Sequence, residues 1–177
     1  MKMLRTIRLD PSDTFIYPTA APPGEWAISG SFVFGDAEPA SLEGKILAAF
    51  RSGFLGAPSL GWSTLAQVVK ADGNDRLTAI ELIAECLLRS FGAPDFDAAR
   101  AAATEEIDFA TSLCDHPPDT LIAVRRVDEG GAIRELFRTL RPRPGAQRWH
   151  AFSYLDAASV EPAEPVDLTA LARGERL

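Results

Sequence analysis

The residues best suited to chemistry are Cys114, Asp115 and His116, in the segment SLCDHPPDT at residues 112–120. A thiol, a carboxylate and an imidazole in a row could form a thiol catalyst or contribute metal ligands. The segment follows a predicted helix, however, and the negative end of a helix dipole disfavours a thiolate. A structural zinc site takes four ligands, and His150 is the only other histidine of the chain. We therefore expect a helix end and a turn here, with no catalytic residue and no metal site.

A second segment, RSGFLGAPSLGWS at residues 51–63, looks like a phosphate-binding loop. Such a loop runs from a strand into a helix N-terminus, where free amides and the helix dipole face the anion. This segment instead follows a predicted helix and precedes a predicted strand, and it lacks the motif's lysine and hydroxyl pair. We interpret it as an apolar loop that either covers the protein's own core, which is the favoured alternative, or docks another protein. Its apolar side chains are Phe54, Leu55, Leu60 and Trp62.

Arginine is concentrated in residues 121–148, where seven arginines and three acidic residues give a net charge of +4, against −7 for the whole chain. A β-hairpin with its turn at Gly130 and Gly131 is predicted within this segment. The turn pairs the following residues across the strands: Leu121 with Leu140, Val124 with Phe137, and Arg126 with Glu135.

Three of these arginines, Arg125, Arg134 and Arg138, are the candidate members of an arginine face on the predicted hairpin. Guanidinium groups on such a face could hold a carboxylate, a phosphate or an acidic partner surface through forked hydrogen bonds. The alternative, a solvated face balanced by the acidic helices of the same chain, is the favoured one of the two.

The composition fits a globular chain, with 177 residues of which 46% are hydrophobic and 24% charged. The acidic net charge argues against nucleic acid as a partner, because nucleic-acid-binding domains carry a basic excess. No apolar run has the length of a signal peptide or a membrane helix, so we expect a cytoplasmic protein without a membrane partner. No cofactor motif is present, and we expect no cofactor.

Residues 1–155 are predicted as one α+β domain, and residues 156–177 as an extended or weakly ordered tail.

Two consecutive helices are the clearest elements in the sequence. Asp75 is predicted to cap the first, whose apolar residues recur at helical spacing up to Phe91. The second begins near Asp95 and runs to Cys114, with an inner face of mostly alanine that permits close approach to a neighbour. Cys86 and Cys114 lie at different distances from the turn between the helices, so we expect no disulfide and interpret both as core residues.

The remaining elements are shorter. Residues 26–34 alternate apolar with small or polar residues, and residues 63–71 are rich in β-branched and apolar residues, so both are predicted as strands. A short helix is predicted from Ser41 to a left-handed Gly53, and a further strand at residues 149–155. Together with the arginine-rich hairpin, these strands predict an α+β fold, an antiparallel sheet covered on one face by the helical hairpin, plus one short additional helix.

Several segments together resemble an uncharacterised family of small proteobacterial proteins classed as a domain of unknown function. They are KMLRTIRLD, EWAISGSFVFGD, FGAPD, EEIDFATSLCDHPPDTLIAV and IRELFRTL, and the resemblance covers most of residues 1–141. The family has no assigned activity, so the resemblance implies no catalytic residue.

Two classes of function remain open. The leading one is a non-catalytic protein-interaction or accessory factor, in assembly or regulation, whose partner is another protein or a second copy of the chain in a homodimer. Its candidate contacts are the apolar loop and the arginine face. The alternative is a protein or enzyme that binds a small anionic molecule in a pocket between sheet and helices, with arginines as anion anchors and His116 as the acid–base residue.

Overall fold

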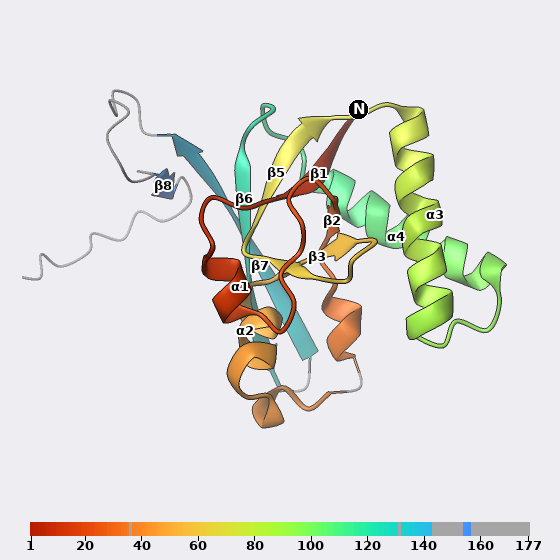
Figure 1. Ribbon diagram of the computed structural model, residues 1–177, viewed down its shortest axis with the longest axis horizontal. Helices are drawn as coiled ribbons and strands as arrows, with labels where there is room; N and C mark the ends of the chain where they lie inside the picture. The colour runs from red at the N-terminus through yellow and green to blue at the C-terminus, as the bar shows by residue number, and fades with distance from the viewer. Residues whose placement is uncertain (36, 131, 143–153, 157–177) are drawn as a thin grey trace, which may run out of the picture.

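The computed structural model describes residues 1–35, 37–130, 132–142 and 154–156. In this part of the chain, eight strands form one antiparallel sheet in the order β4-β3-β2-β1-β5-β6-β7-β8 (Figure 1). The strands are β1 (Lys2–Ile7), β2 (Trp26–Ile28), β3 (Phe54–Ala57), β4 (Trp62–Ser63), β5 (Leu65–Lys70), β6 (Leu121–Glu129), β7 (Ala132–Pro142) and β8 (Tyr154–Asp156). The helices are α1 (Ser12–Ile16), α2 (Gly44–Ser52), α3 (Gly73–Ser90) and α4 (Phe96–Ser112), with 3-10 turns η1 (Ser31–Phe34) and η2 (Pro39–Ser41). The predicted α+β fold is confirmed.

The helical hairpin of α3 and α4 packs on β1, β2 and β3, and Figure 1 shows it on the side of the molecule away from α1 and α2. Its inner face includes Ala99 and Ala103, which are fully buried and let the two helices approach closely. α4 begins next to Asp95 as predicted, and the Asp95 side chain caps it by accepting a hydrogen bond from the backbone amide of Ala98. The cap of α3 is Asp72, not the predicted Asp75, because the side chains of these two residues form a reciprocal capping box one turn earlier.

The predicted strand at residues 26–34 is shorter in the structure. β2 ends at Ile28, and Gly30 takes a left-handed conformation (φ 73°) that starts η1. A Cβ on Gly30 would lie 2.5 Å from the Cβ of Leu55, so only glycine fits where the chain leaves the sheet. The apolar side chain of Phe34 therefore reaches the core from a 3-10 turn, where it packs on Phe50 with ring centroids 5.3 Å apart.

The predicted apolar loop is a β-hairpin within the sheet. β3 and β4 pair with each other, and β3 also pairs with β2. Gly53 is extended (φ −96°) instead of left-handed, because α2 passes directly into β3. The short helix before it begins at Gly44, later than the predicted Ser41, which belongs to η2.

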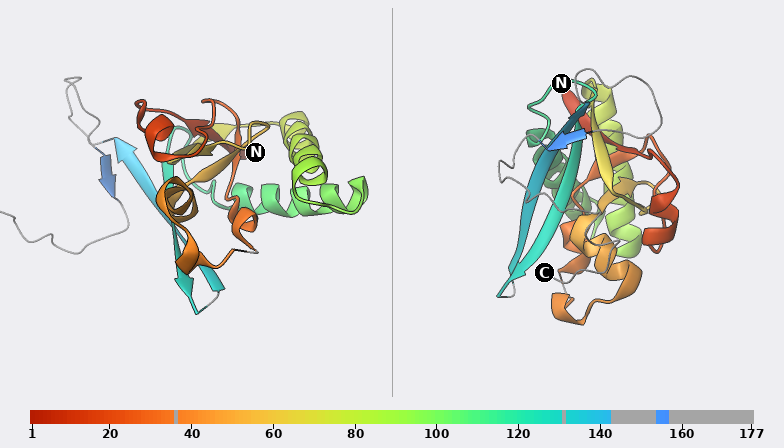
Figure 2. Two further views of the ribbon diagram at one scale, coloured as in Figure 1. Left: turned by 60° about the horizontal axis from the view of Figure 1, so that its bottom comes forward. Right: turned by 90° about the vertical axis from the view of Figure 1, so that its left-hand side faces the viewer.

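The β6–β7 hairpin has the predicted register, with Leu121 opposite Leu140, Val124 opposite Phe137, and Arg126 opposite Glu135. It forms a long ribbon along one side of the molecule (Figure 2). The pairing of β5 with β6 ends at Ala123, and α2 contacts β6. The last strand, β8, overlaps the predicted strand at residues 149–155. The predicted tail at residues 156–177 lies outside the described residues except for Asp156.

Candidate functional site

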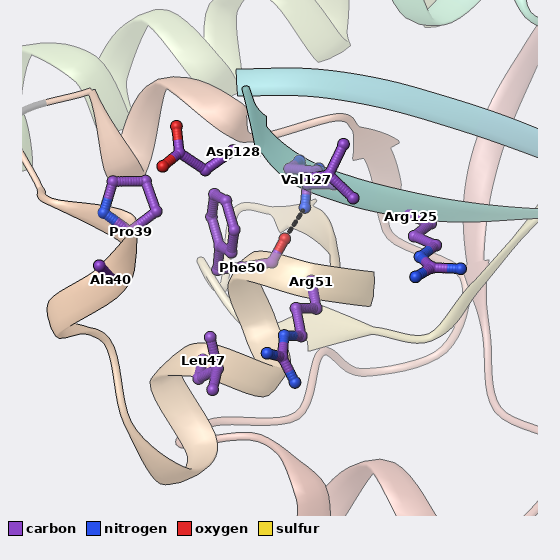
Figure 3. A pocket seen from close by; sticks show the side chains of 9 residues that line it. Pro39, Ala40, Leu47, Phe50, Arg51, Arg125, Val127 and Asp128 are labelled. Atoms are coloured by element: carbon purple, nitrogen blue, oxygen red, sulfur yellow. Dashed lines mark hydrogen bonds between the residues drawn. The ribbon is translucent and has the colours of Figure 1, made fainter. Parts of the chain in front are cut away.

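A cleft of about 440 Å³ lies between β6 and the segment formed by η2 and α2 (Figure 3). We call it the arginine cleft. It is lined by Pro39, Ala40, Leu47, Phe50, Arg51, Arg125, Arg126, Val127 and Asp128. Its lining therefore combines an apolar surface with three arginines and one acidic residue.

Arg51 and Arg125 bring positive charge to this cleft from two different elements. Arg51 stands in the last turn of α2, where a cation interacts favourably with the helix dipole. Arg125 projects from the exposed face of β6. Neither side chain makes a hydrogen bond or an ion pair with any residue that the structure describes. Asp128 does have a partner, and Figure 3 shows it beside Pro39, away from both arginines. Two guanidinium groups are therefore available to an anion.

The third arginine, Arg126, has a structural role. It is 1% exposed, and its Nε donates a 2.6 Å hydrogen bond to the carboxylate of Glu135. Its other nitrogens donate to the carbonyls of Phe50 and Gly53, at 2.9 Å each, and to the carbonyl of Ser29; Figure 3 draws the bond to Phe50. A helix leaves its last carbonyls without intrahelical partners, so Arg126 closes the end of α2.

The arginine face is only partly available for binding. Arg125, Arg134 and Arg138 share the outer face of the hairpin, as the register shows, and all three are exposed. Arg134 is paired with Glu129 at 2.9 Å, and Arg138 also has an interaction partner. Of the three predicted residues, only Arg125 reaches the arginine cleft, where it is joined by Arg51, which the sequence analysis did not identify.

The apolar candidates lie inside the protein. Phe54, Leu55 and Trp62 are at most 6% exposed and belong to the core, and Leu60 packs against it half-buried. Every residue of β3 and β4 is buried, so both faces of β3 are covered. These side chains cover the protein's own core and offer no docking patch in this structure.

The segment around His116 is a turn after α4. The backbone amide of His116 donates to the carbonyl of Cys114, and Lys2 donates to the carbonyl of His116 at 2.7 Å. His116 lines neither the arginine cleft nor a second cleft, which is lined by Phe32 and Phe91. Burial raises the pKa of the Cys114 thiol to about 11. Among the described residues, no three histidine, cysteine or acidic side chains are placed to hold a metal ion.

No helix within the described ranges is both long and apolar enough to cross a membrane.

Comparisons with known proteins identify the family. No curated protein matches the sequence. No solved structure matches the chain. One family model, a family of unknown function, matches residues 1–166, which is most of the chain. The chain therefore belongs to the family of unknown function DUF6505.

Proposed function

We propose that this protein is a non-catalytic accessory factor that binds an acidic segment of a partner protein in the arginine cleft. One observation carries the proposal: Arg51 and Arg125 line the same cleft, and neither has a partner among the described residues. The proposal also places the protein in the bacterial cytoplasm, in line with the expectation from the sequence.

The chemistry of the cleft favours a segment that is both acidic and apolar. The planar guanidinium groups of Arg51 and Arg125 match the geometry of carboxylates and can bind them through paired hydrogen bonds. The side chains of Leu47, Phe50 and Val127 supply an apolar surface next to these charges. Burying an apolar group of the partner there contributes affinity, while the arginines select for negative charge.

A second candidate function is the binding of a small anionic molecule in the same cleft. The observation that favours it is the volume of about 440 Å³, which lies within the range of roughly 300 to 1,000 Å³ typical of small-molecule sites. The same two arginines would then hold the carboxylate or phosphate group of the ligand.

The test is gentle capture of the tagged chain from its own host, followed by native mass spectrometry. Wild type is compared with the double variant Arg51→Glu/Arg125→Glu and with the control Arg134→Glu, which reverses a charge that Glu129 already neutralises. Acidic segments of a captured protein are then titrated as synthetic peptides. The proposal expects a partner and a peptide that bind wild type and the control but are lost from the double variant.

Other outcomes separate the alternatives. A small-molecule mass increment that disappears in the double variant supports the second candidate function. A dimer mass that survives in all three proteins shows self-association through another surface and contradicts the proposal. If Arg134→Glu loses the partner as completely as the double variant, the arginine face as a whole binds it and the assignment to the cleft is wrong.

A further inference from the structure

A second cleft, of about 450 Å³, lies between η1 and the helical hairpin. We call it the hairpin cleft. Its walls are largely apolar, and they include Phe32 and Val33 from η1 and Leu87 and Phe91 from the α3 side. The rings of Phe32 and Phe91 meet edge to face with centroids 5.1 Å apart. This cleft shares no lining residue with the arginine cleft, so nothing inferred from it depends on the proposed function.

The charged residues of the hairpin cleft are both acidic. Glu105 and Glu106, adjacent on α4, line it, and no basic residue does. Oε2 of Glu106 is buried and has no hydrogen-bond partner among the described residues. A buried polar atom without a partner costs free energy, roughly 1 to 3 kcal/mol. Few such groups occur in native proteins, and each calls for an explanation.

The nearby basic residue cannot supply the missing partner. Arg126 is the cation that acts on Glu106, and its three nitrogens are already engaged by Glu135, by carbonyls at the end of α2 and by Ser29. The carboxylate of Glu135 adds a second negative charge, and Glu105 adds a third. Burial, reinforced by Glu135 and Glu105 and opposed by Arg126, raises the pKa of Glu106 to about 7. The negative charges around Glu106 therefore outnumber the positive charge of Arg126, and no hydrogen-bond donor among the described residues reaches Oε2.

We propose that the hairpin cleft binds a primary amine carried on a compact apolar body, with the ammonium group held by Glu106 and the apolar body packed against the contacting rings of Phe32 and Phe91. An ammonium group brings a positive charge and three N–H donors. The cleft has the volume for such a ligand.

The experiment titrates the full chain with cyclohexylmethylamine and with cyclohexylmethanol, its uncharged counterpart, and follows backbone amide signals by NMR. The proposal expects the amine to bind at least about tenfold more tightly than the alcohol at one pH unit above the Glu106 pKa of about 7. One unit below that pKa the carboxyl is protonated, while the amine, with a pKa near that of lysine, stays charged. The preference for the amine is then lost.

Three variants locate the site. Glu106→Gln removes the preference for the amine above the pKa, whereas the control Glu105→Gln keeps most of it. Ala102→Phe fills the cleft from an exposed position on α4 and blocks both probes without changing Glu106. Equal affinity of wild type for the two probes above the pKa, undetectable binding of the amine, or an amine preference that survives in Glu106→Gln each overturns the proposal.

Discussion

Arg126 and Glu135 lie directly opposite each other on β6 and β7, and the guanidinium Nε donates a 2.6 Å hydrogen bond to the carboxylate. The Arg126 side chain is fully buried and that of Glu135 is only 14% exposed. This ion pair therefore belongs to the interior, where it joins the strand ladder to the end of α2.

Removing the negative partner of this pair should destabilise the protein. Glu135→Gln leaves the buried Arg126 charge uncompensated, and we expect the free energy of unfolding to fall by about 3 kcal/mol in urea denaturation. The control is Glu129→Gln, which breaks the exposed pair with Arg134 and should cost less than about 1 kcal/mol. Equal losses of unfolding free energy in the two variants would show that the buried pair contributes no more to stability than the exposed pair.

The pH dependence of stability should report Glu106. Its pKa is about 7 in the folded protein, against 4.5 for an unperturbed glutamate. As the pH rises from 4.5 to about 7, Glu106 loses its proton in the unfolded chain before it does so in the folded protein. The stability that protonated Glu106 contributes is therefore fully present below pH 4.5 and is lost as the pH rises through about 7. Glu106→Gln should therefore be more stable than wild type above about pH 7, by about 1 to 3 kcal/mol.

Thermal unfolding across this pH range measures the effect. The difference between Glu106→Gln and wild type should vanish below a pH of 4.5, the unperturbed value. The matched variant Glu105→Gln, which removes the neighbouring acid on α4, should follow wild type closely. A difference in stability between wild type and Glu106→Gln that stays constant from pH 4.5 to about pH 7 would contradict the burial of this carboxyl.

Both cysteines should be inert in the folded protein. Cys86 and Cys114 are free and buried, and burial raises the pKa of each thiol. Because the thiolate is the reactive form, we expect an aromatic disulfide reagent to label them only as fast as the protein unfolds. The comparison is Thr78→Cys, at an exposed position of α3, whose added thiol should react quickly. Labelling of wild type at the speed of this variant would show that a native thiol is accessible.

Two glycines should respond in opposite directions to alanine. A Cβ on Gly53 would lie 2.7 Å from the Trp62 ring and 2.9 Å from the carbonyl oxygen of Ala49, so Gly53→Ala should cost about 1 to 3 kcal/mol of stability. Gly73 begins α3 and has no atom near its missing Cβ. Gly73→Ala should stabilise the protein by about 0.5 kcal/mol. Denaturant titration of both variants tests the pair, and a neutral Gly53→Ala would contradict the close packing.

The elements that sequence analysis predicted well are those with local determinants. The hairpin register follows from one turn and complementary pairs such as Val124 and Phe137, and the helical hairpin follows from periodic apolar residues and the helix start near Asp95. Helix α1 was not predicted, because its five residues are too few for a periodic pattern. The sequence analysis explained Gly53 by a left-handed helix end. In the structure, a glycine is needed there because the ring of Trp62 leaves no room for a Cβ atom.

Less of the candidate site could be predicted from the sequence, because the site depends on contacts between residues far apart in the chain. The sequence predicts Arg126 opposite Glu135, but the carbonyls that accept its other hydrogen bonds come from α2 and from Ser29. A local signal did exist, since Arg126 shares its strand face with the apolar Ile122 and Val124. The sequence does not indicate that Arg51 belongs to the site, because only the packing of α2 beside β6 places it in the same cleft as Arg125.

The position of β1 has a consequence for the order in which the sheet assembles. β1 comes first in the chain but lies between β2 and β5, and it pairs along its whole length with β5. On the ribosome, β1 must therefore wait until residues 65–70 have emerged, and closing so long a loop costs entropy. The β6–β7 hairpin needs only its own short turn. We expect pulse-labelled hydrogen exchange during refolding to protect the amides of this late-synthesised hairpin before those of the strand that was made first.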